Sequence, residues 1–218
     1  MTDLQFSVLG IEPELFAVTP NLVVRLRIAE TSGALVYAVV LNCQIRIEPQ
    51  RRKYSSDEAA GLRDLFGPRD RWGSTLRTFP WLHTATTVPG FSGSYDATLL
   101  IPCTYDFEVT AAKYLHALEH GQGGLVPLVL LFSGTVFTRS GSGIHVERIP
   151  WHCEAPYDMP VAVWHALIQQ HYPNSGWLRL ETDTLKQLAR IKAERGLTTL
   201  DAAIADLVRE HEPGEVAP

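Results

Sequence analysis

The residues best suited to chemistry are the two histidines and the glutamate of His116-Ala117-Leu118-Glu119-His120. Histidines four positions apart on a helix share one face and can ligate zinc, with a carboxylate as general base and a third ligand from elsewhere. Glycines follow directly, so His120 falls at a helix end, where the helix dipole alone favours histidine. A zinc hydrolase using His116 and His120 is therefore an alternative hypothesis.

A second candidate is Trp151-His152-Cys153, which places an imidazole beside a thiol. A cysteine and a histidine that face each other can form a nucleophile. Neighbours in an extended chain point in opposite directions, so these two side chains are not expected to meet. The glycine-rich stretch Gly121-Gln122-Gly123-Gly124 lacks the Lys-Ser/Thr end of a phosphate-binding loop. The sequence thus predicts no catalytic residue and no cofactor.

The run Gln50-Arg51-Arg52-Lys53 is the main cluster of basic residues. It follows a predicted strand, so its simplest interpretation is a solvated strand end. The alternative is a surface that receives an acidic partner. The two interpretations differ in whether these cations are paired within the protein.

Composition limits the class of protein. The chain has 218 residues, 45% of them hydrophobic and 20% charged, with a net charge of -5, which is typical of a soluble globular protein and does not favour a polyanionic ligand. Three cysteines lie far apart, at Cys43, Cys103 and Cys153, which argues against a disulfide framework. No signal peptide or membrane-spanning segment is evident, so we expect a cytoplasmic protein without membrane insertion.

The elements that would position these residues centre on the apolar run Leu125–Phe132. After Ser140-Gly141-Ser142-Gly143 the chain returns through 144–149, a pattern typical of a β-hairpin. Because the run is apolar on both alternating faces, it predicts an interior strand of a sheet covered on both sides.

Other segments show strand or helix periodicity. Alternation predicts antiparallel strands, and in the third of them places Leu35, Tyr37 and Cys43 on one inward face. The spacing Ser55-x-x-Glu58 predicts a capping box that begins a helix. The predicted strands are 4–9, 22–29, 35–47, 79–88 and 95–101; the predicted helices are 57–66, 111–118 and 160–171; the proline-rich segment 150–160 is expected to be an irregular connection.

The C-terminal segment shows a short strand at 177–180 and two helices, which begin near Thr182 or Asp183 and near Thr198 or Thr199. The stretch Trp177–Leu185 resembles the ribbon and first helix of ribbon-helix-helix proteins, in which paired ribbons read the DNA major groove. The resemblance implies that Trp177, Arg179 and Glu181 would face DNA. A helical hairpin that caps the sheet domain, or that mediates dimerisation, explains the same pattern.

Three further stretches carry a broader resemblance: Cys43–Arg52, Leu131–Phe137 and Pro173–Leu178. Together they resemble a bacterial family of unknown function whose genes tend to lie beside those of uptake nickel-iron hydrogenases. This resemblance implies an accessory, assembly or partner-binding role and transfers no site residues. The order of strands and helices also has a fainter similarity to the SecB-type export chaperones.

We therefore expect an α+β protein: a mainly antiparallel β-sheet or β-sandwich over 1–155 with short inserted helices, then a helical region over 156–211 with a strand at 177–180, and a flexible tail at 212–218. The expected function is non-enzymatic and chaperone-like, the binding of a protein partner such as a hydrogenase subunit or maturation factor. Nucleic acid is not the favoured partner, and self-association remains open.

Overall fold

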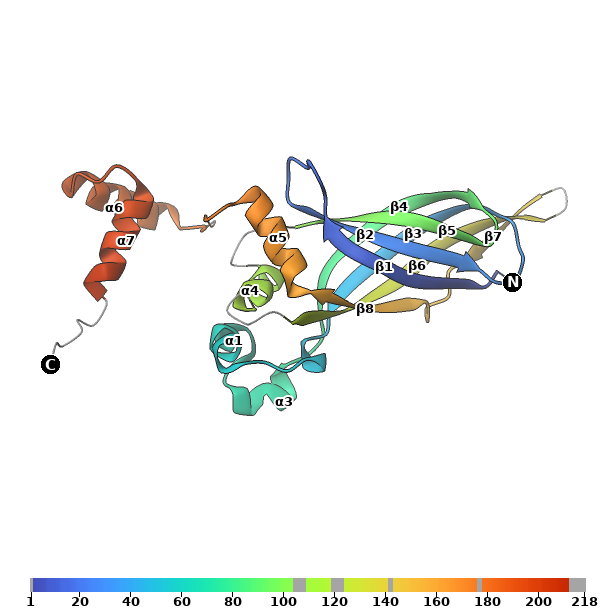
Figure 1. The fold of residues 1–218 in the computed structure, drawn as a ribbon, viewed down its shortest axis with the longest axis horizontal. Helices are drawn as coiled ribbons and strands as arrows, with labels where there is room; N and C mark the ends of the chain where they lie inside the picture. The colour runs from blue at the N-terminus through green and yellow to red at the C-terminus, as the bar shows by residue number, and fades with distance from the viewer. Residues whose placement is uncertain (1, 104–108, 119–123, 141–142, 176–177, 212–218) are drawn as a thin grey trace. The chain divides into compact units, whose positions relative to one another are not determined.

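Two antiparallel sheets dominate the fold (Figure 1). The computed structural model describes residues 2–103, 109–118, 124–140, 143–175 and 178–211. The chain divides into one unit that ends at Trp177 and a second that begins at Leu178. The first unit contains all the strands of the described residues. The expectation of an α+β protein with antiparallel sheets and C-terminal helices is confirmed.

The smaller sheet has the order β1-β2-β5, made by β1 (Leu4–Pro13), β2 (Asn21–Glu30) and β5 (Ser94–Pro102). The central strand β2 buries Leu22, Val24, Leu26 and Ile28 and exposes Arg25 and Arg27, as its alternation predicts. On the outer face the Arg27 guanidinium donates two hydrogen bonds, of 2.7 and 2.8 Å, to the Asp96 carboxylate of β5.

The larger sheet has the order β4-β3-β6-β7, and β8 also pairs with β6. Its strands are β3 (Val36–Ile47), β4 (Phe79–Phe91), β6 (Leu125–Ser140), β7 (Gly143–Arg148) and β8 (Glu154–Pro160). β3 pairs along most of β6 on one side, while β7 and β8 pair with opposite ends of β6 on the other. The apolar run is thus an interior strand, and the predicted hairpin is confirmed.

Only one face of β6 is fully covered. Leu128, Leu130 and Phe132 are buried, whereas Val129 and Leu131 are half-buried. The prediction of a sheet covered on both sides is wrong here, because a sandwich buries the inner face of each sheet and leaves the outer face toward solvent. The inner faces meet directly, as the stacked rings of Phe6 on β1 and Phe132 show, with centroids 4.2 Å apart.

Two other expectations about strands are corrected. Leu35 and Tyr37 are 49% and 61% exposed, because a register shift between Val36 and Ala38 moves the inward position to Val36; Cys43 is buried as predicted. The segment expected to be irregular contains β8, which buries Ala155 and Met159. Its prolines are tolerated because β8 pairs on one side only.

Short helices gather at one end of the sandwich (Figure 1). They are η1 (Pro49–Arg51), α1 (Ser56–Gly61), α2 (Arg63–Phe66), η2 (Arg69–Arg71), α3 (Trp72–Thr75), α4 (Thr110–Ala117) and α5 (Val161–His171). The capping box is confirmed: the Ser55 hydroxyl accepts from the Glu58 amide at 3.1 Å, and the Glu58 carboxylate accepts from the Ser55 amide at 2.8 Å. The predicted helix 57–66 is divided into α1 and α2 at the buried Leu62.

An aromatic cluster joins these helices to the sandwich. The Tyr54 hydroxyl donates to the Pro49 carbonyl at 2.7 Å and lies 2.8 Å from the Tyr114 hydroxyl of α4, which must therefore act as the donor between them. Burial raises the pKa of both tyrosines, so both stay neutral and can keep these bonds. Trp164 of α5 is 1% exposed and belongs to the hydrophobic core at this end.

The second unit is a pair of helices, α6 (Thr182–Glu194) and α7 (Leu200–His211). Gly196, with a φ of 65°, lies between them, and Thr199 caps α7 by accepting a hydrogen bond from the Ala202 amide at 3.0 Å. The N-cap of α6 is Glu181, one residue before Thr182 and two before Asp183, the predicted caps.

The predicted strand at 177–180 is absent from Leu178–Leu180, and Trp177 lies outside the described residues. The expected boundary at 155/156 falls inside β8, and the chain divides instead after residue 177. The expected tail at 212–218 also lies outside the described residues. In the part of the chain that is described, no helix has both the length and the apolar character needed to cross a bilayer.

Candidate functional site

Of the predicted zinc site, only His116 lies within the described residues. His116 lies on α4, is 8% exposed, and packs edge-on against Trp164 with ring centroids 5.8 Å apart. Glu119 and His120 lie outside the described residues. Within the described segments, no three His, Cys, Asp or Glu side chains come close enough together to hold a metal ion. His116 is therefore placed as a core aromatic of the helical end.

The His152 and Cys153 side chains are separated, although the segment forms a turn, closed by a 3.1 Å hydrogen bond from the Cys153 amide to the Pro150 carbonyl, and not an extended strand. His152 is exposed beside the ring of Trp151, whereas Cys153 is 7% exposed, with its thiol 3.8 Å from the Leu4 carbonyl oxygen. Burial raises the pKa of the Cys153 thiol, and this lowers the fraction of reactive thiolate. This pair is not arranged as an activated nucleophile.

The predicted DNA-facing residues come from a segment without strand structure among its described residues. Arg179 is exposed, Glu181 is the N-cap of α6, and Trp177 lies outside the described residues. A reading face needs a ribbon that holds these side chains in register. The single chain does not supply that ribbon in Leu178–Leu180.

The basic run has two distinct parts. Arg52 is internal: its guanidinium lies 2.6 Å from the Glu58 carboxylate, with side chains 10% and 4% exposed, and 4.9 Å from the Tyr54 ring centroid. The Glu58 carboxylate thus caps the N-terminus of α1 and also neutralises the charge of Arg52. The interpretation of the run as a solvated strand end does not apply to Arg52.

Arg51 and Lys53 face outward. The Arg51 guanidinium lies 2.7 Å from the Glu48 carboxylate and 3.9 Å from that of Asp158, and the hydrogen bond to Glu48 raises the pKa of Arg51. Lys53 is exposed, and no acidic group of the described residues lies within ion-pair distance of it. Arg51 therefore joins β3 to β8, while Lys53 is available to a ligand.

Arg51 lies at the junction of two adjoining hollows over β3, β6 and β8, which we call the outer groove. One hollow has a volume of about 440 Å³ and the other about 340 Å³. The outer groove is lined by Arg46, Glu48, Arg51, Arg52, Lys53, Thr78, Gly124, Leu125, Pro127, Val129, Leu131, Glu154, Pro156 and Asp158. Its floor is apolar and its walls carry charges of both signs.

Arg46 and Arg52 are the arginines of the outer groove that have a buried guanidinium nitrogen without a partner among the described residues, and Arg46 also lacks an ion pair there. Arg46 lies on β3 opposite Val129 of β6, which in turn is opposite Pro156 of β8. Its Nε is buried and has no hydrogen-bond partner among the described residues. A buried guanidinium nitrogen without a partner is desolvated at a cost, which Arg46 would recover by turning its guanidinium toward an acceptor bound in the outer groove.

Arg46 was not among the candidate residues that the sequence indicated. The sequence pattern could have indicated it, because Arg46 is a charged residue on the outward face of a strand whose other face is apolar. What could not be foreseen is that β8 pairs with β6 and encloses Arg46 within a groove.

Residues 1–216 match the family described as a family of unknown function, DUF6084. The chain belongs to that family. The match spans both structural units, so the sandwich and the helical pair are parts of one family architecture. A search of curated proteins finds no match.

Solved structures show only distant similarity. A β-glucosidase from Kluyveromyces marxianus aligns with 8% identity and a TM-score of 0.27, over 72% of this chain and 15% of its own. β-Glucosidase 3B from Thermotoga neapolitana, in complex with α-D-glucose, aligns with 13% identity and a TM-score of 0.25, over 72% of this chain and 17% of its own. The chain spans less than a fifth of either enzyme's length.

Proposed function

We propose that this protein is a non-enzymatic accessory protein that binds another protein through the outer groove. The observation that carries the proposal is Arg46, whose Nε is buried without a partner among the described residues, above an apolar floor that includes Val129 and Leu131. Interfaces combine such apolar contact with a few fixed polar groups, and arginine is enriched at their centres.

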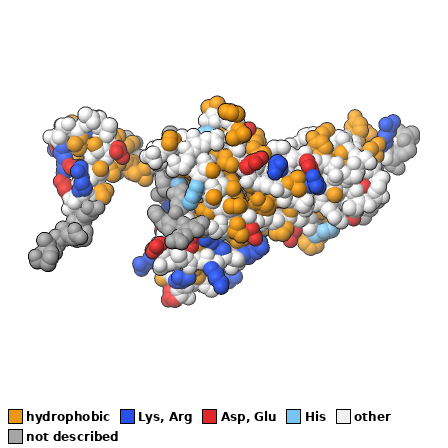
Figure 2. Space-filling model, in the orientation of Figure 1, with side chains coloured by type: hydrophobic (Ala, Val, Ile, Leu, Met, Phe, Trp, Pro, Cys, Tyr) orange, Lys and Arg blue, Asp and Glu red, His pale blue; other side chains and the backbone are white. Residues whose placement is uncertain are grey.

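Charge slightly favours an acidic segment of the partner. The outer groove is lined by four basic and three acidic residues, and the surrounding segment from Arg46 to Arg77 has eight basic and five acidic residues, although the whole chain carries -5. Figure 2 shows blue side chains gathered over the short helices of this end of the sandwich. Arg46 and Lys53 lie in different hollows of the outer groove, so a segment with two acidic residues could meet both.

The chemistry of recognition follows from the side chains. A carboxylate can accept two parallel hydrogen bonds from a guanidinium, a geometry that is stronger and more selective than contact with a point charge. The apolar floor gives the neighbouring side chains of the segment a surface to pack against, which provides area without requiring polar partners.

The resemblance to a family encoded beside uptake nickel-iron hydrogenases supports a finer proposal: the partner is a hydrogenase subunit or a maturation factor, and the protein acts during assembly. Its expected place is the cytoplasm. The test is affinity purification of the tagged full chain from its native host, followed by identification of the co-purified proteins.

Arg46→Met is the informative variant, because methionine keeps an apolar stem and removes the guanidinium. Arg63→Met is the matched control, since Arg63 is exposed on α2 in the same basic segment and does not line the outer groove. We expect retention of the partner to fall about tenfold or more with Arg46→Met, equivalent to about 1.4 kcal/mol, and to be unchanged with Arg63→Met. Equal retention by both variants would refute the role of the outer groove.

The two alternatives have direct tests. A zinc hydrolase using His116 and His120 would contain stoichiometric zinc by elemental analysis and lose it in His116→Ala. A DNA-binding regulator would retard its own promoter fragment at low salt, with affinity falling in Arg179→Ala. In the described residues, no observation favours either alternative over protein binding.

A further inference from the structure

The helical pair α6 and α7 buries few of its apolar side chains. Among its described residues only Leu188 and Ala203 are buried. Leu185 of α6 is 41% exposed, and Leu200 and Val208 of α7 are 37% and 55% exposed. On α6 the exposed Leu185 lies three positions from the buried Leu188, and on α7 the exposed Leu200 and Val208 are eight positions apart, so these apolar residues form a stripe along one side of each helix.

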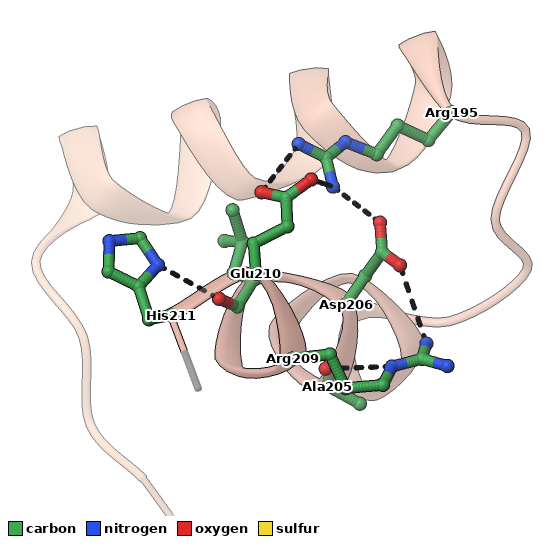
Figure 3. A network of polar contacts seen from close by, with 7 residues as sticks. Arg195, Ala205, Asp206, Arg209, Glu210 and His211 are labelled. Carbon is green, nitrogen blue, oxygen red and sulfur yellow. Dashed lines mark hydrogen bonds and ion pairs between the residues drawn. The ribbon is translucent and has the colours of Figure 1, made fainter. Parts of the chain in front are cut away.

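Polar contacts join the two helices near the turn (Figure 3). Arg195, the C-cap of α6, donates to the carboxylates of Asp206 and Glu210 on α7, and its bonds to Glu210 measure 2.8 and 3.2 Å. Arg209 also contacts Asp206 at 3.4 Å. Ion pairs as exposed as these typically contribute about 0–1 kcal/mol each, so they orient the helices without accounting for their stability.

The small size of the unit limits how much apolar surface it can bury by itself. The second unit begins at Leu178 and comprises about 40 residues, including those outside the described segments. Chains of roughly that length usually need disulfides, metals or oligomerisation to fold, because they bury too little apolar surface. All three cysteines lie in the first unit, and no metal-binding group is found among the described residues. Of these three sources of stability, oligomerisation is the one consistent with the described residues.

The charges of the unit identify a suitable partner. From Leu178 to His211 the chain carries six basic and six acidic residues. Such a surface has no net charge to repel an identical copy, although the whole chain is acidic. An apolar stripe on each helix, between balanced charges, is suited to self-complementary pairing about a two-fold axis.

We infer that a second copy of this chain covers the apolar stripe of α6 and α7, so that the two helical pairs form a four-helix interface. Leu185, Leu200 and Val208 become buried in that interface. This inference does not depend on the proposed function, because the outer groove lies wholly within the first unit.

Analytical ultracentrifugation of the full chain over a concentration series tests the inference. The wild type is expected to sediment as a dimer that dissociates on dilution. Leu185→Glu together with Val208→Glu places charges in the interface and is expected to raise the dimer dissociation constant at least tenfold. The control is Gln187→Glu, which adds a charge at an exposed position about 200° around α6 from Leu185.

Folding of the first unit serves as an internal check, because none of the three substitutions lies in it. The thermal unfolding temperature of the sandwich should be the same in the wild type, the double variant and Gln187→Glu. All three are compared at the same protein concentration, chosen so that the chains are dissociated. A monomeric wild type at every concentration would overturn the inference and show that the stripe is covered within one chain or by another protein. A dimer that survives Leu185→Glu with Val208→Glu would also overturn it, as would equal weakening by Gln187→Glu.

Discussion

Removal of the Glu58 carboxylate should destabilise the sandwich far more than a comparable change at its surface. In Glu58→Ala, Arg52 keeps its charge, only 10% of its side chain is exposed, and its 2.6 Å partner is lost. Breaking a buried ion pair by removing one partner typically costs about 3–5 kcal/mol, because the remaining charge is desolvated without compensation. The same substitution removes one half of the capping box of α1.

The neighbouring pair provides the control. Arg51 lies 2.7 Å from Glu48, but these side chains are 43% and 20% exposed. Solvent screens such a pair, so Arg51→Met should cost about 0–1 kcal/mol despite a similar distance. Two adjacent arginines, each paired with a glutamate, are thus predicted to differ severalfold in importance because of burial.

Urea unfolding followed by tryptophan fluorescence would measure both free energies of unfolding. For a domain of this size, the loss of about 3–5 kcal/mol corresponds to a fall in Tm of roughly 6–20 °C. The double variant Arg52→Met with Glu58→Ala should recover much of the loss, because it removes the uncompensated charge. A cost below about 1 kcal/mol for Glu58→Ala, or no recovery in the double variant, would refute this account of the helical end.

Two further predictions concern the sheets. Hydrogen bonds from the Thr2 amide, at 2.7 Å, and from His145, at 3.0 Å, lower the pKa of Glu147 to about 2. The contribution of Glu147 to stability is therefore present above the unfolded pKa of roughly 4.3 and is lost as the pH falls toward 2. In urea unfolding from pH 5 to pH 2, the free energy of unfolding should decline less in Glu147→Gln than in the wild type, and parallel curves would contradict this. Gly134 has a φ of 134°, and a Cβ there would lie 2.0 Å from the Val40 carbonyl oxygen. In thermal unfolding, Gly134→Ala should therefore cost more than about 3 kcal/mol or prevent folding. Gly143→Ala, where a Cβ meets no atom within 4 Å, should be nearly neutral.

Local patterns predicted the elements whose causes lie within a few residues. The alternation of β2, the hairpin of β6 and β7, and the capping box of Ser55 and Glu58 all appear in the structure as expected. Each depends on side-chain period or on a hydrogen bond between near neighbours. The inward position near Tyr37 of β3 was predicted wrongly. A register shift there exchanges the inward and outward sides of the strand, and the alternation of apolar residues in the sequence does not indicate where such a shift occurs.

The outer groove required contacts that no local pattern contains. Arg46 and Glu154 line the same hollow although they are far apart in sequence, because β8 returns to pair with β6. The basic run was recognised as a cluster, but its division into a buried Arg52 and an outward Arg51 and Lys53 depends on where α1 places Glu58.

The sequence by itself determined that this chain builds antiparallel sheets around an apolar central strand and ends in two amphipathic helices, because periodicity and capping act over a few residues. Only the tertiary structure decided that one face of that strand remains open as a groove, that Arg46 lies in it, and that His116 packs against Trp164. Those outcomes depend on which distant strands and helices meet, and that is set by the burial of the whole core rather than by any single segment.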